Sequence, residues 1–243
     1  MIELAPWAWV LLGLGAVVTG LSKSAIPGSA TVSVVLFASV LPARTSTAAM
    51  LLLFIVGDVF ALSAYRRHAH WPTLVRLAPA VVAGLLAGFA LLAVGDDRLV
   101  RRMIGVILLA MVAVTLWRRH RAMAPAKGPF VAGGYGALAG FTTMVANAGG
   151  PVMAMYFLAT RTPVQVFLGT SAWFFAIVNL AKLPFLAGLG LFTPQVLLTD
   201  LALAPLVVIG GLVGLRLAKR MPQHLFDRIV IALTVLGAVY LLF

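Results

Sequence analysis

The residues Asn147-Ala148-Gly149-Gly150-Pro151 divide a long apolar region of this chain into two pieces, residues 130–146 and residues 149–160. Such pieces are short for a full membrane crossing, and glycine and proline at the junction favour a turn over a continuous helix. A second interruption of this kind lies near the amino terminus, where residues 5–21 and 28–41 are separated by Ser22-Lys23-Ser24-Ala25-Ile26-Pro27-Gly28. The sequence therefore predicts two broken helical regions.

Outside these two breaks, long apolar runs dominate the chain. Of its 243 residues 63% are hydrophobic and 10% are charged, whereas an ordinary soluble domain has about 25% charged residues. This composition excludes soluble enzymes, secreted disulfide scaffolds and nucleic-acid-binding domains, so we expect the lipid bilayer and no nucleic acid as a partner. The runs are continuous rather than alternating, which favours an all-α polytopic membrane protein. Runs close to the roughly 20 residues that cross a bilayer lie at 45–64, 74–94, 99–117, 165–186, 195–217 and 224–243.

The chain also contains an internal duplication. The segment from Pro79 to Gly88 matches the segment from Pro205 to Gly214, which lies 126 residues later. At a spacing of 121 residues Asp58 corresponds to Asn179, and the two broken regions then stand at the front of their halves. We expect two homologous repeats, each a broken or re-entrant region followed by three long transmembrane helices. The first repeat covers residues 1–121, a basic cytoplasmic linker covers 122–129, and the second repeat covers 130–243.

The positive charge indicates how the repeats are related. The net charge is +12, and cytoplasmic loops of membrane proteins carry an excess of Lys and Arg. All three basic clusters can lie on one side if the second broken region makes an even number of crossings, which inverts the two repeats. If each broken region is one kinked crossing, the repeats are parallel with eight helices, and the third cluster lies outside. The positive-inside rule favours the inverted arrangement. The clusters are Arg66-Arg67-His68 with Arg76, Arg118-Arg119-His120-Arg121 with Lys127, and Arg216 with Lys219 and Arg220.

Broken helices in corresponding positions indicate a transporter binding site, because the freed backbone groups need a cavity, water or a ligand. Helix starts near Gly28 and Gly149 would direct amide N–H groups and a positive dipole end at an anion. Hydroxyl and amide groups near the breaks would add donors, although hydroxyls can also bond back within their own helices and glycines can serve close packing. The substrate-binding residues expected at the breaks are Ser22, Ser24, Gly28, Thr142, Thr143, Asn147, Gly149 and Gly150.

Ionisable residues inside apolar runs are the more specific signal, because charge at the bilayer centre is costly. Lys23 lies in the first break, and Lys182 follows Asn179 by three residues on one helix face, so these three side chains join the expected binding site. Asp58 is the candidate for proton coupling. The alternatives are that the lysines extend to the membrane surface and that Asp58 forms a salt bridge between helices. Asp200 near the start of its run could be interfacial.

We expect no metal, no cofactor and no enzymatic site. The chain has no cysteine, and its histidines lie at loops or run ends without acidic partners at metal-ligand spacing. It contains no nucleophile elbow, phosphate loop or His-Glu-x-x-His pattern.

Several segments resemble the TauE/SafE sulfite-exporter family, which includes 4-toluene sulfonate uptake permease-like transporters. The resemblance is most specific in Gly140-Phe141-Thr142-Thr143-Met144-Val145-Ala146-Asn147-Ala148-Gly149-Gly150-Pro151. It continues in Gly169-Thr170-Ser171-Ala172-Trp173-Phe174-Phe175, in Asn179-Leu180-Ala181-Lys182-Leu183-Pro184-Phe185, in Gly20-Leu21-Ser22-Lys23-Ser24 and in Asp58-Val59-Phe60-Ala61. It covers nearly the whole chain and implies a multi-pass carrier of the bacterial inner membrane that moves sulfite or organosulfonates, commonly outward.

The sequence thus predicts a secondary active exporter of small sulfur-containing oxyanions, with the anion bound at the midplane between the two broken helices. A passive anion channel on the same scaffold and a non-transporting membrane subunit are the alternatives. The sequence leaves the oligomeric state open, with a homodimer as one option.

Overall fold

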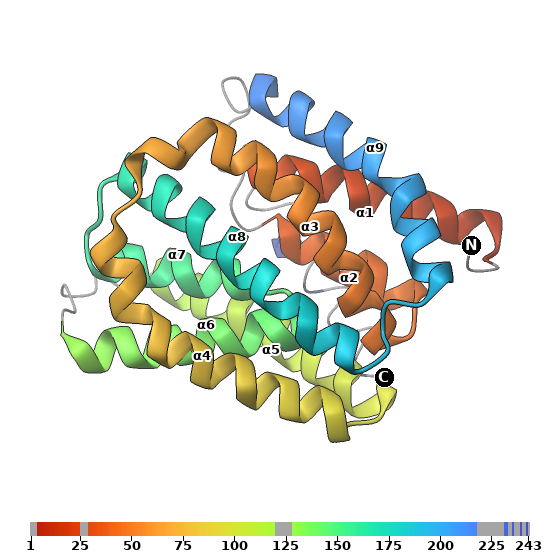
Figure 1. Ribbon diagram of the computed structural model, residues 1–243, viewed down its shortest axis with the longest axis horizontal. Helices are drawn as coiled ribbons and strands as arrows, with labels where there is room; N and C mark the ends of the chain where they lie inside the picture. The colour runs from red at the N-terminus through yellow and green to blue at the C-terminus, as the bar shows by residue number, and fades with distance from the viewer. Residues whose placement is uncertain are drawn as a thin grey trace.

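The computed structural model describes residues 4–24, 29–119 and 128–217, together with positions 231, 232, 235, 239 and 242. These residues are mostly helical and include no strand. Figure 1 shows an elongated helical bundle. Its elements are α1 (Pro6–Ser24), α2 (Ala30–Val40), α3 (Ala43–Tyr65), the 3-10 helix η1 (Arg66–His68), α4 (Trp71–Val94), α5 (Asp97–Arg119), α6 (Pro129–Ala146), α7 (Gly149–Ala159), α8 (Val164–Gly188) and α9 (Pro194–Leu217).

The predicted all-α membrane protein is confirmed. Five of the described helices are long and apolar enough to cross a membrane by length and composition: α1, α3, α4, α8 and α9. The run at 99–117 is helical as predicted, but α5 is not among these five. It begins with Asp97 and Arg98 and also contains Arg101 and Arg102, which lowers its mean hydropathy. The last predicted run, 224–243, lies almost wholly outside the described residues.

The first break begins later than predicted. Helix α1 continues to Ser24, so Ser22, Lys23 and Ser24 form its last turn instead of a loop. The Oγ atom of Ser22 donates to the carbonyl of Thr19 at 2.7 Å, and that of Ser24 donates to the carbonyl of Gly20 at 3.1 Å. Hydroxyls that bond back to their own helix are satisfied inside it, and for this reason the last turn of α1 accommodates both serines.

The second break is shorter than predicted and consists of Asn147 and Ala148 alone. Gly149 and Gly150 already belong to α7, and Pro151 stands in its first turn. A proline is tolerated there because the first N–H groups of a helix have no partner within the helix.

Both breaks are the turning points of helical hairpins. The rings of Tyr135 in α6 and Tyr156 in α7 lie 5.8 Å apart, so α7 folds back along α6. In the first hairpin the Oγ atom of Ser33 in α2 donates to the carbonyl of Gly15 in α1 at 2.9 Å. Gly15 also faces the Phe37 ring, so α2 runs back along α1.

Helix α4 packs closely and in parallel against α6 through glycines. A Cβ atom on Gly84 would overlap the carbonyl oxygen of Ala137, and one on Gly140 would overlap that of Val81. Further along both helices, a Cβ atom on Gly88 would lie 2.7 Å from the Cβ of Met144. The two backbones therefore touch without intervening side chains, as in other small-residue helix interfaces in membranes.

Helix α1 packs against α9 in a corresponding way. A Cβ atom on Gly20 would overlap the carbonyl oxygen of Val207, and one on Gly210 would overlap that of Val17. In the predicted duplication, Gly20 corresponds to Gly140 and Gly84 corresponds to Gly210. The same pair of glycines thus recurs at both close contacts.

We expect Gly84→Ala to destabilise the protein by about 1–3 kcal/mol, because the added methyl group would have to push two helix backbones apart. The matched control is Gly133→Ala in α6, where a Cβ atom would meet nothing within 4 Å. That control should be neutral or more stable by up to about 1 kcal/mol, since alanine favours helix more than glycine does. Thermal unfolding of the purified variants measures both effects, and equal melting temperatures for the two would contradict this packing.

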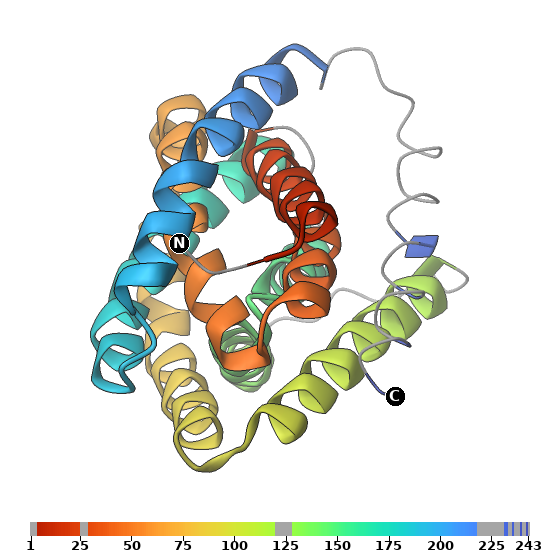
Figure 2. The same ribbon diagram turned by 90° about the vertical axis from the view of Figure 1, so that its right-hand side faces the viewer.

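Contacts between helix ends show which helices start at the same end of the bundle. The backbone N–H of Arg44 donates to Asp97 Oδ1 at 3.1 Å, so the starts of α3 and α5 are neighbours. The backbone N–H of His70 donates to Thr170 Oγ1 at 2.9 Å, which joins the start of α4 to the start of α8. Figure 2, a view close to the long axis, shows α9 and α5 on opposite outer flanks of the bundle.

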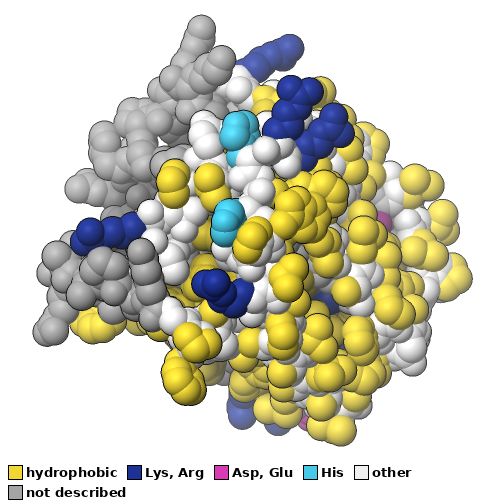
Figure 3. Space-filling model, turned by 60° about the vertical axis from the view of Figure 1, so that its left-hand side comes forward, with side chains coloured by type: hydrophobic (Ala, Val, Ile, Leu, Met, Phe, Trp, Pro, Cys, Tyr) yellow, Lys and Arg dark blue, Asp and Glu magenta, His cyan; other side chains and the backbone are white. Residues whose placement is uncertain are grey.

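The end of the molecule formed by the starts of α4 and α8 is basic. It carries Arg66, Arg67, His68 and Arg76, and we call it the basic end. Figure 3 shows dark blue Lys and Arg and cyan His side chains at this end, while yellow hydrophobic side chains predominate on the flank beside them. This contrast is what a membrane-embedded flank next to an aqueous end requires.

Candidate functional site

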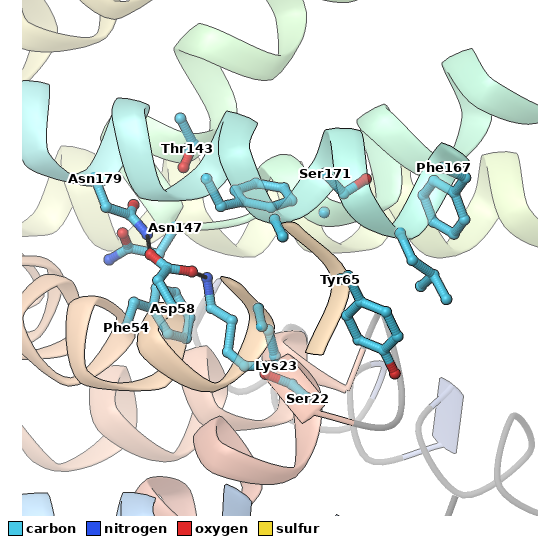
Figure 4. A pocket seen from close by; sticks show the side chains of 16 residues that line it. Ser22, Lys23, Phe54, Asp58, Tyr65, Thr143, Asn147, Phe167, Ser171 and Asn179 are labelled. Carbon is cyan, nitrogen blue, oxygen red and sulfur yellow. Dashed lines mark hydrogen bonds and ion pairs between the residues drawn. The ribbon is translucent and has the colours of Figure 1, made fainter. Parts of the chain in front are cut away.

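A cavity lies between the two hairpins and is lined from both of them (Figure 4). Its empty volume is about 730 Å³, including space open to the surroundings. The end of α1 contributes Ser22 and Lys23, and the α6–α7 turn contributes Thr143, Asn147 and Gly150. Helices α3 and α8 supply most of the other walls. The two breaks, which are far apart in the sequence, therefore meet at one site, which we call the central cavity.

An ion pair and an amide form one chain of polar contacts across the central cavity. Lys23 Nζ donates to Asp58 Oδ1 at 2.5 Å, and Asn179 Nδ2 donates to Asp58 Oδ2 at 2.7 Å. The Lys23 and Asp58 side chains are only 11% and 4% exposed. These polar contacts connect α1, α3 and α8, as Figure 4 shows. Each charge of the pair compensates the other in the protein interior.

Lys23 is held in place by its neighbours as well as by its charge. Its ammonium lies 4.8 Å from the ring centre of Phe54 and 4.9 Å from that of Phe175, within the range of cation–π attraction. Its stem lies against Gly57, where a Cβ atom would come 2.8 Å from Lys23 Cγ. The alternative that Lys23 extends to the membrane surface is wrong, because this side chain turns inward to Asp58.

Lys182 of α8 is completely buried behind the α6–α7 turn. Its Nζ donates to the carbonyl oxygen of Thr143 at 2.7 Å and to Asn147 Oδ1 at 2.6 Å. Asn147 Nδ2 in turn donates to the carbonyl of Thr47 in α3 at 3.0 Å. A cation at the last carbonyls of a helix is favourable, so Lys182 caps α6 and ties the break to α8. The alternative that Lys182 extends to the surface is also wrong.

The turn at Asn147 depends on its backbone conformation. Asn147 has φ 51°, in the left-handed region that asparagine tolerates better than most residues. Gly149 is packed, since a Cβ atom there would lie 3.0 Å from Thr143 Cβ, whereas a Cβ atom on Gly150 would meet nothing within 4 Å. Gly150 therefore leaves the first turn of α7 open to the cavity.

The structure brings most of the predicted site residues together, but not all of them. Of the predicted residues, those that line the central cavity are Ser22, Lys23, Asp58, Thr143, Asn147, Gly150 and Asn179. Ser24 and Thr142 do not line it, and their hydroxyls bond back to Gly20 and Leu138, as the within-helix alternative predicted. Gly149 and Lys182 support the wall from behind, and Gly28 lies outside the described residues.

Asp58 and Asp200 have different environments. The alternative that Asp58 forms a salt bridge between helices is confirmed by its contact with Lys23. Asp200 on α9 is 5% exposed and does not line the central cavity, and neither of its carboxylate oxygens has a hydrogen-bond partner among the described residues.

The outer wall of the cavity was not predicted from the sequence. Tyr65 at the end of α3 and Phe167 and Ser171 near the start of α8 line it toward the basic end. Inside the apolar runs such residues look like ordinary packing residues, so nothing in the sequence marked them. Ser171 Oγ and Asn179 Oδ1 are buried and find no hydrogen-bond partner in the described part of the chain, so the lining holds polar atoms that a ligand or water can satisfy.

The charges of the site favour an anion. Around the described part of the cavity two lysines, Lys23 and Lys182, stand against one carboxylate, Asp58. A cluster of three or more His, Asp or Glu side chains that could hold a metal ion does not occur among the described residues. Near the start of α7 the cavity is bordered by hydrogen-bond donors, because the first N–H groups of the helix adjoin it at Gly150.

Comparison with known proteins identifies the family of this chain. Neither the curated proteins nor the solved structures contained a match to it. The family described as sulfite exporter TauE/SafE matches residues 12–241, which is nearly the whole chain and includes both hairpins and the central cavity. On this evidence the chain belongs to the TauE/SafE sulfite exporter family of membrane transporters.

Proposed function

We propose that this protein is a secondary active exporter of small sulfur-containing oxyanions, such as sulfite or organosulfonates, and that the anion binds in the central cavity. The observation that carries this proposal is the meeting of both broken regions at one cavity with two lysines and one carboxylate. The family supports the class of substrate. We also propose that the protein lies in the bacterial inner membrane.

The contacts suggest how an anion would be held. Lys23 is the cation on the cavity wall, while Ser171, Thr143 and the first turn of α7 at Gly150 offer further donors. Lys182 acts indirectly, because its contacts keep Asn147 and the end of α6 in position.

The Lys23–Asp58 pair offers a route to proton coupling. An arriving anion competes with the Asp58 carboxylate for the Lys23 ammonium. Protonation of Asp58 would weaken its bond to Lys23 and free the ammonium for the anion. Release of that proton would restore the pair and expel the anion, so one proton, on Asp58, and one anion, at Lys23, would bind and leave together.

We further propose that residues 1–121 and 130–243 are two inverted repeats joined by the basic linker 122–129. The matching glycine contacts of α4 with α6 and of α1 with α9 support the repeat. The helix ends support the inversion. The start of α6 lies at the basic end, beside Thr73 and Arg76 of α4, whereas α2 leads directly into α3, whose start neighbours α5 at the opposite end.

Single cysteines test this arrangement, since the chain has none of its own. Arg67 and Arg161 lie at the basic end and Arg98 at the start of α5. We expect cysteines at 67 and 161 to react with an impermeant thiol reagent only from the cytoplasmic side and a cysteine at 98 only from the other side. Reaction of all three from one side of intact and inverted vesicles would contradict the proposal.

Flux measurements test the function itself. Purified protein in liposomes should move sulfite, thiosulfate or a small organosulfonate, and an imposed pH gradient should change the rate. Empty liposomes and liposomes with the Lys182→Met variant are the controls. The proposal fails if none of these anions moves. Flux that ignores the pH gradient and persists in Asp58→Asn would instead favour a passive anion channel, and co-purification with a partner without flux would favour a transport-inactive subunit.

A further inference from the structure

A second polar pocket lies at the basic end, apart from the central cavity. It is bounded by the first turns of α4, the start of α6 and the segment after α7, and it has an empty volume of about 520 Å³ including open space. Arg76, Tyr156 and the threonines Thr73, Thr160 and Thr162 line it. It shares no lining residue with the central cavity, and we call it the basic-end pocket.

Tyr156 contributes a hydroxyl to this pocket. The residue as a whole is 5% exposed. Its ring packs against the rings of Tyr135 and Phe157, with distances between ring centres of 5.8 Å and 5.4 Å. No hydrogen bond to its hydroxyl occurs within the described part of the chain, although the residue lines the pocket. Since this hydroxyl is not among the fully buried unpaired polar atoms of the described residues, it opens onto the pocket, where its O–H is available to a ligand.

Arg76 supplies a positive charge at the same place. It lies close enough to Tyr156 for the two groups to interact electrostatically, and none of the described carboxylates is within ion-pair distance of its guanidinium. Guanidinium groups bind phosphate and related oxyanions through parallel N–H bonds.

The other groups around the pocket are compatible with an anion. Thr160 Oγ1 and Thr162 Oγ1 lie 2.9 Å apart, so their hydroxyls form one polar wall. Gly128 and Val131 bring in the start of α6, where the first N–H groups of the helix have no partner within it. Among the described residues, the pocket lining contains one cation and no carboxylate.

The position of the pocket indicates its depth relative to the membrane, which is the level of the membrane–water interface. Trp71, at the start of the same helix as Arg76, is 49% exposed, and exposed tryptophans at helix ends mark the membrane–water interface. Basic pockets between helices at this level accept the phosphate groups of anionic lipids.

We propose that the basic-end pocket binds a phosphate-type oxyanion between the Arg76 guanidinium and the Tyr156 hydroxyl. The anion is the headgroup phosphate of an anionic phospholipid or free inorganic phosphate, which share this chemistry. This site is independent of anion transport through the central cavity, so either can fail without the other.

Binding to the purified full-length chain tests this. Inorganic phosphate is titrated against the protein in neutral detergent and followed by the melting temperature, and phosphatidylglycerol binding is followed by native mass spectrometry after phosphatidylcholine exchange. The variants are Arg76→Gln and Tyr156→Phe, which removes only the hydroxyl. The matched control is Arg67→Gln, which removes one exposed positive charge from the same end without touching the pocket.

We expect Arg76→Gln to weaken binding about tenfold or more, Tyr156→Phe to weaken it by a smaller factor, and Arg67→Gln to bind as the parent chain does. Binding of phosphatidylglycerol that free phosphate does not displace identifies a lipid site, and displacement by phosphate identifies a site for the free anion. Two results would overturn the proposal: no binding of either compound, or an equal loss in Arg67→Gln and Arg76→Gln.

Discussion

Removing either partner of the Lys23–Asp58 pair is expected to destabilise the protein by about 3–5 kcal/mol, because the remaining charge is then buried without a counter-ion. In Asp58→Asn the uncompensated group is the Lys23 ammonium, and in Lys23→Met it is the Asp58 carboxylate, which keeps only the contact with Asn179. The pair is almost fully buried, which justifies the size of this effect.

The double variant Lys23→Met/Asp58→Asn separates stability from transport. It buries no unpaired charge, so most of the stability should return, in line with other buried ion pairs replaced by neutral groups. Transport should not return, because the proposed anion contact and the proposed proton acceptor are both gone. Thermal unfolding and liposome flux on the same four proteins measure the two effects. Stability losses that simply add in the double variant would show that the two side chains do not act as a pair.

The second large effect is expected for Lys182→Met. Methionine fills a similar volume without a charge, but it leaves Asn147 Oδ1 and the Thr143 carbonyl without their donor. The α6–α7 turn would lose the contact that holds it on α8, and a shift of about 1 Å in a binding group can lower a rate by roughly 100-fold. We therefore expect transport to fall by about that factor.

The matched control for Lys182→Met is Leu180→Met on the same helix. Leu180 is 54% exposed on the flank of the bundle and does not line the central cavity, so its replacement should leave transport unchanged. Flux at saturating substrate and thermal unfolding should be measured together. A Lys182→Met protein that transports at the rate of Leu180→Met would show that the Lys182 contacts are not needed for function.

Several features of the fold could be predicted because they depend on local sequence. Apolar length predicted the long helices, and the cluster from Asn147 to Pro151 predicted the turn between α6 and α7. The end of α1 was misplaced, because the sequence does not tell whether Ser22 and Ser24 bond back within the helix or leave it.

The charged residues of the site could be predicted from the sequence, but the partners that they contact could not. The rarity of ionisable residues in apolar runs picked out Lys23, Asp58 and Lys182 without any knowledge of their neighbours. The partners are set by how helices pack, and Lys23 and Asp58 are 35 positions apart on different helices. Tyr65 and Phe175 could not be found at all, since an aromatic residue in an apolar run has the same pattern whether it packs in the core or lines a cavity.

The central claim is that a small oxyanion binds in the cavity between the two hairpins, and protection of one cysteine tests it most directly. Gly150→Cys places a thiol where an added Cβ meets only open space at the start of α7, and Arg67→Cys is an exposed control in this cysteine-free chain. Maleimide labelling is timed with and without sulfate or a small alkylsulfonate, which do not consume the reagent. The account predicts that these anions slow labelling at position 150 but not at 67, and that Lys23→Met abolishes the protection. Labelling at 150 that no anion slows, or equal slowing at both positions, would contradict it.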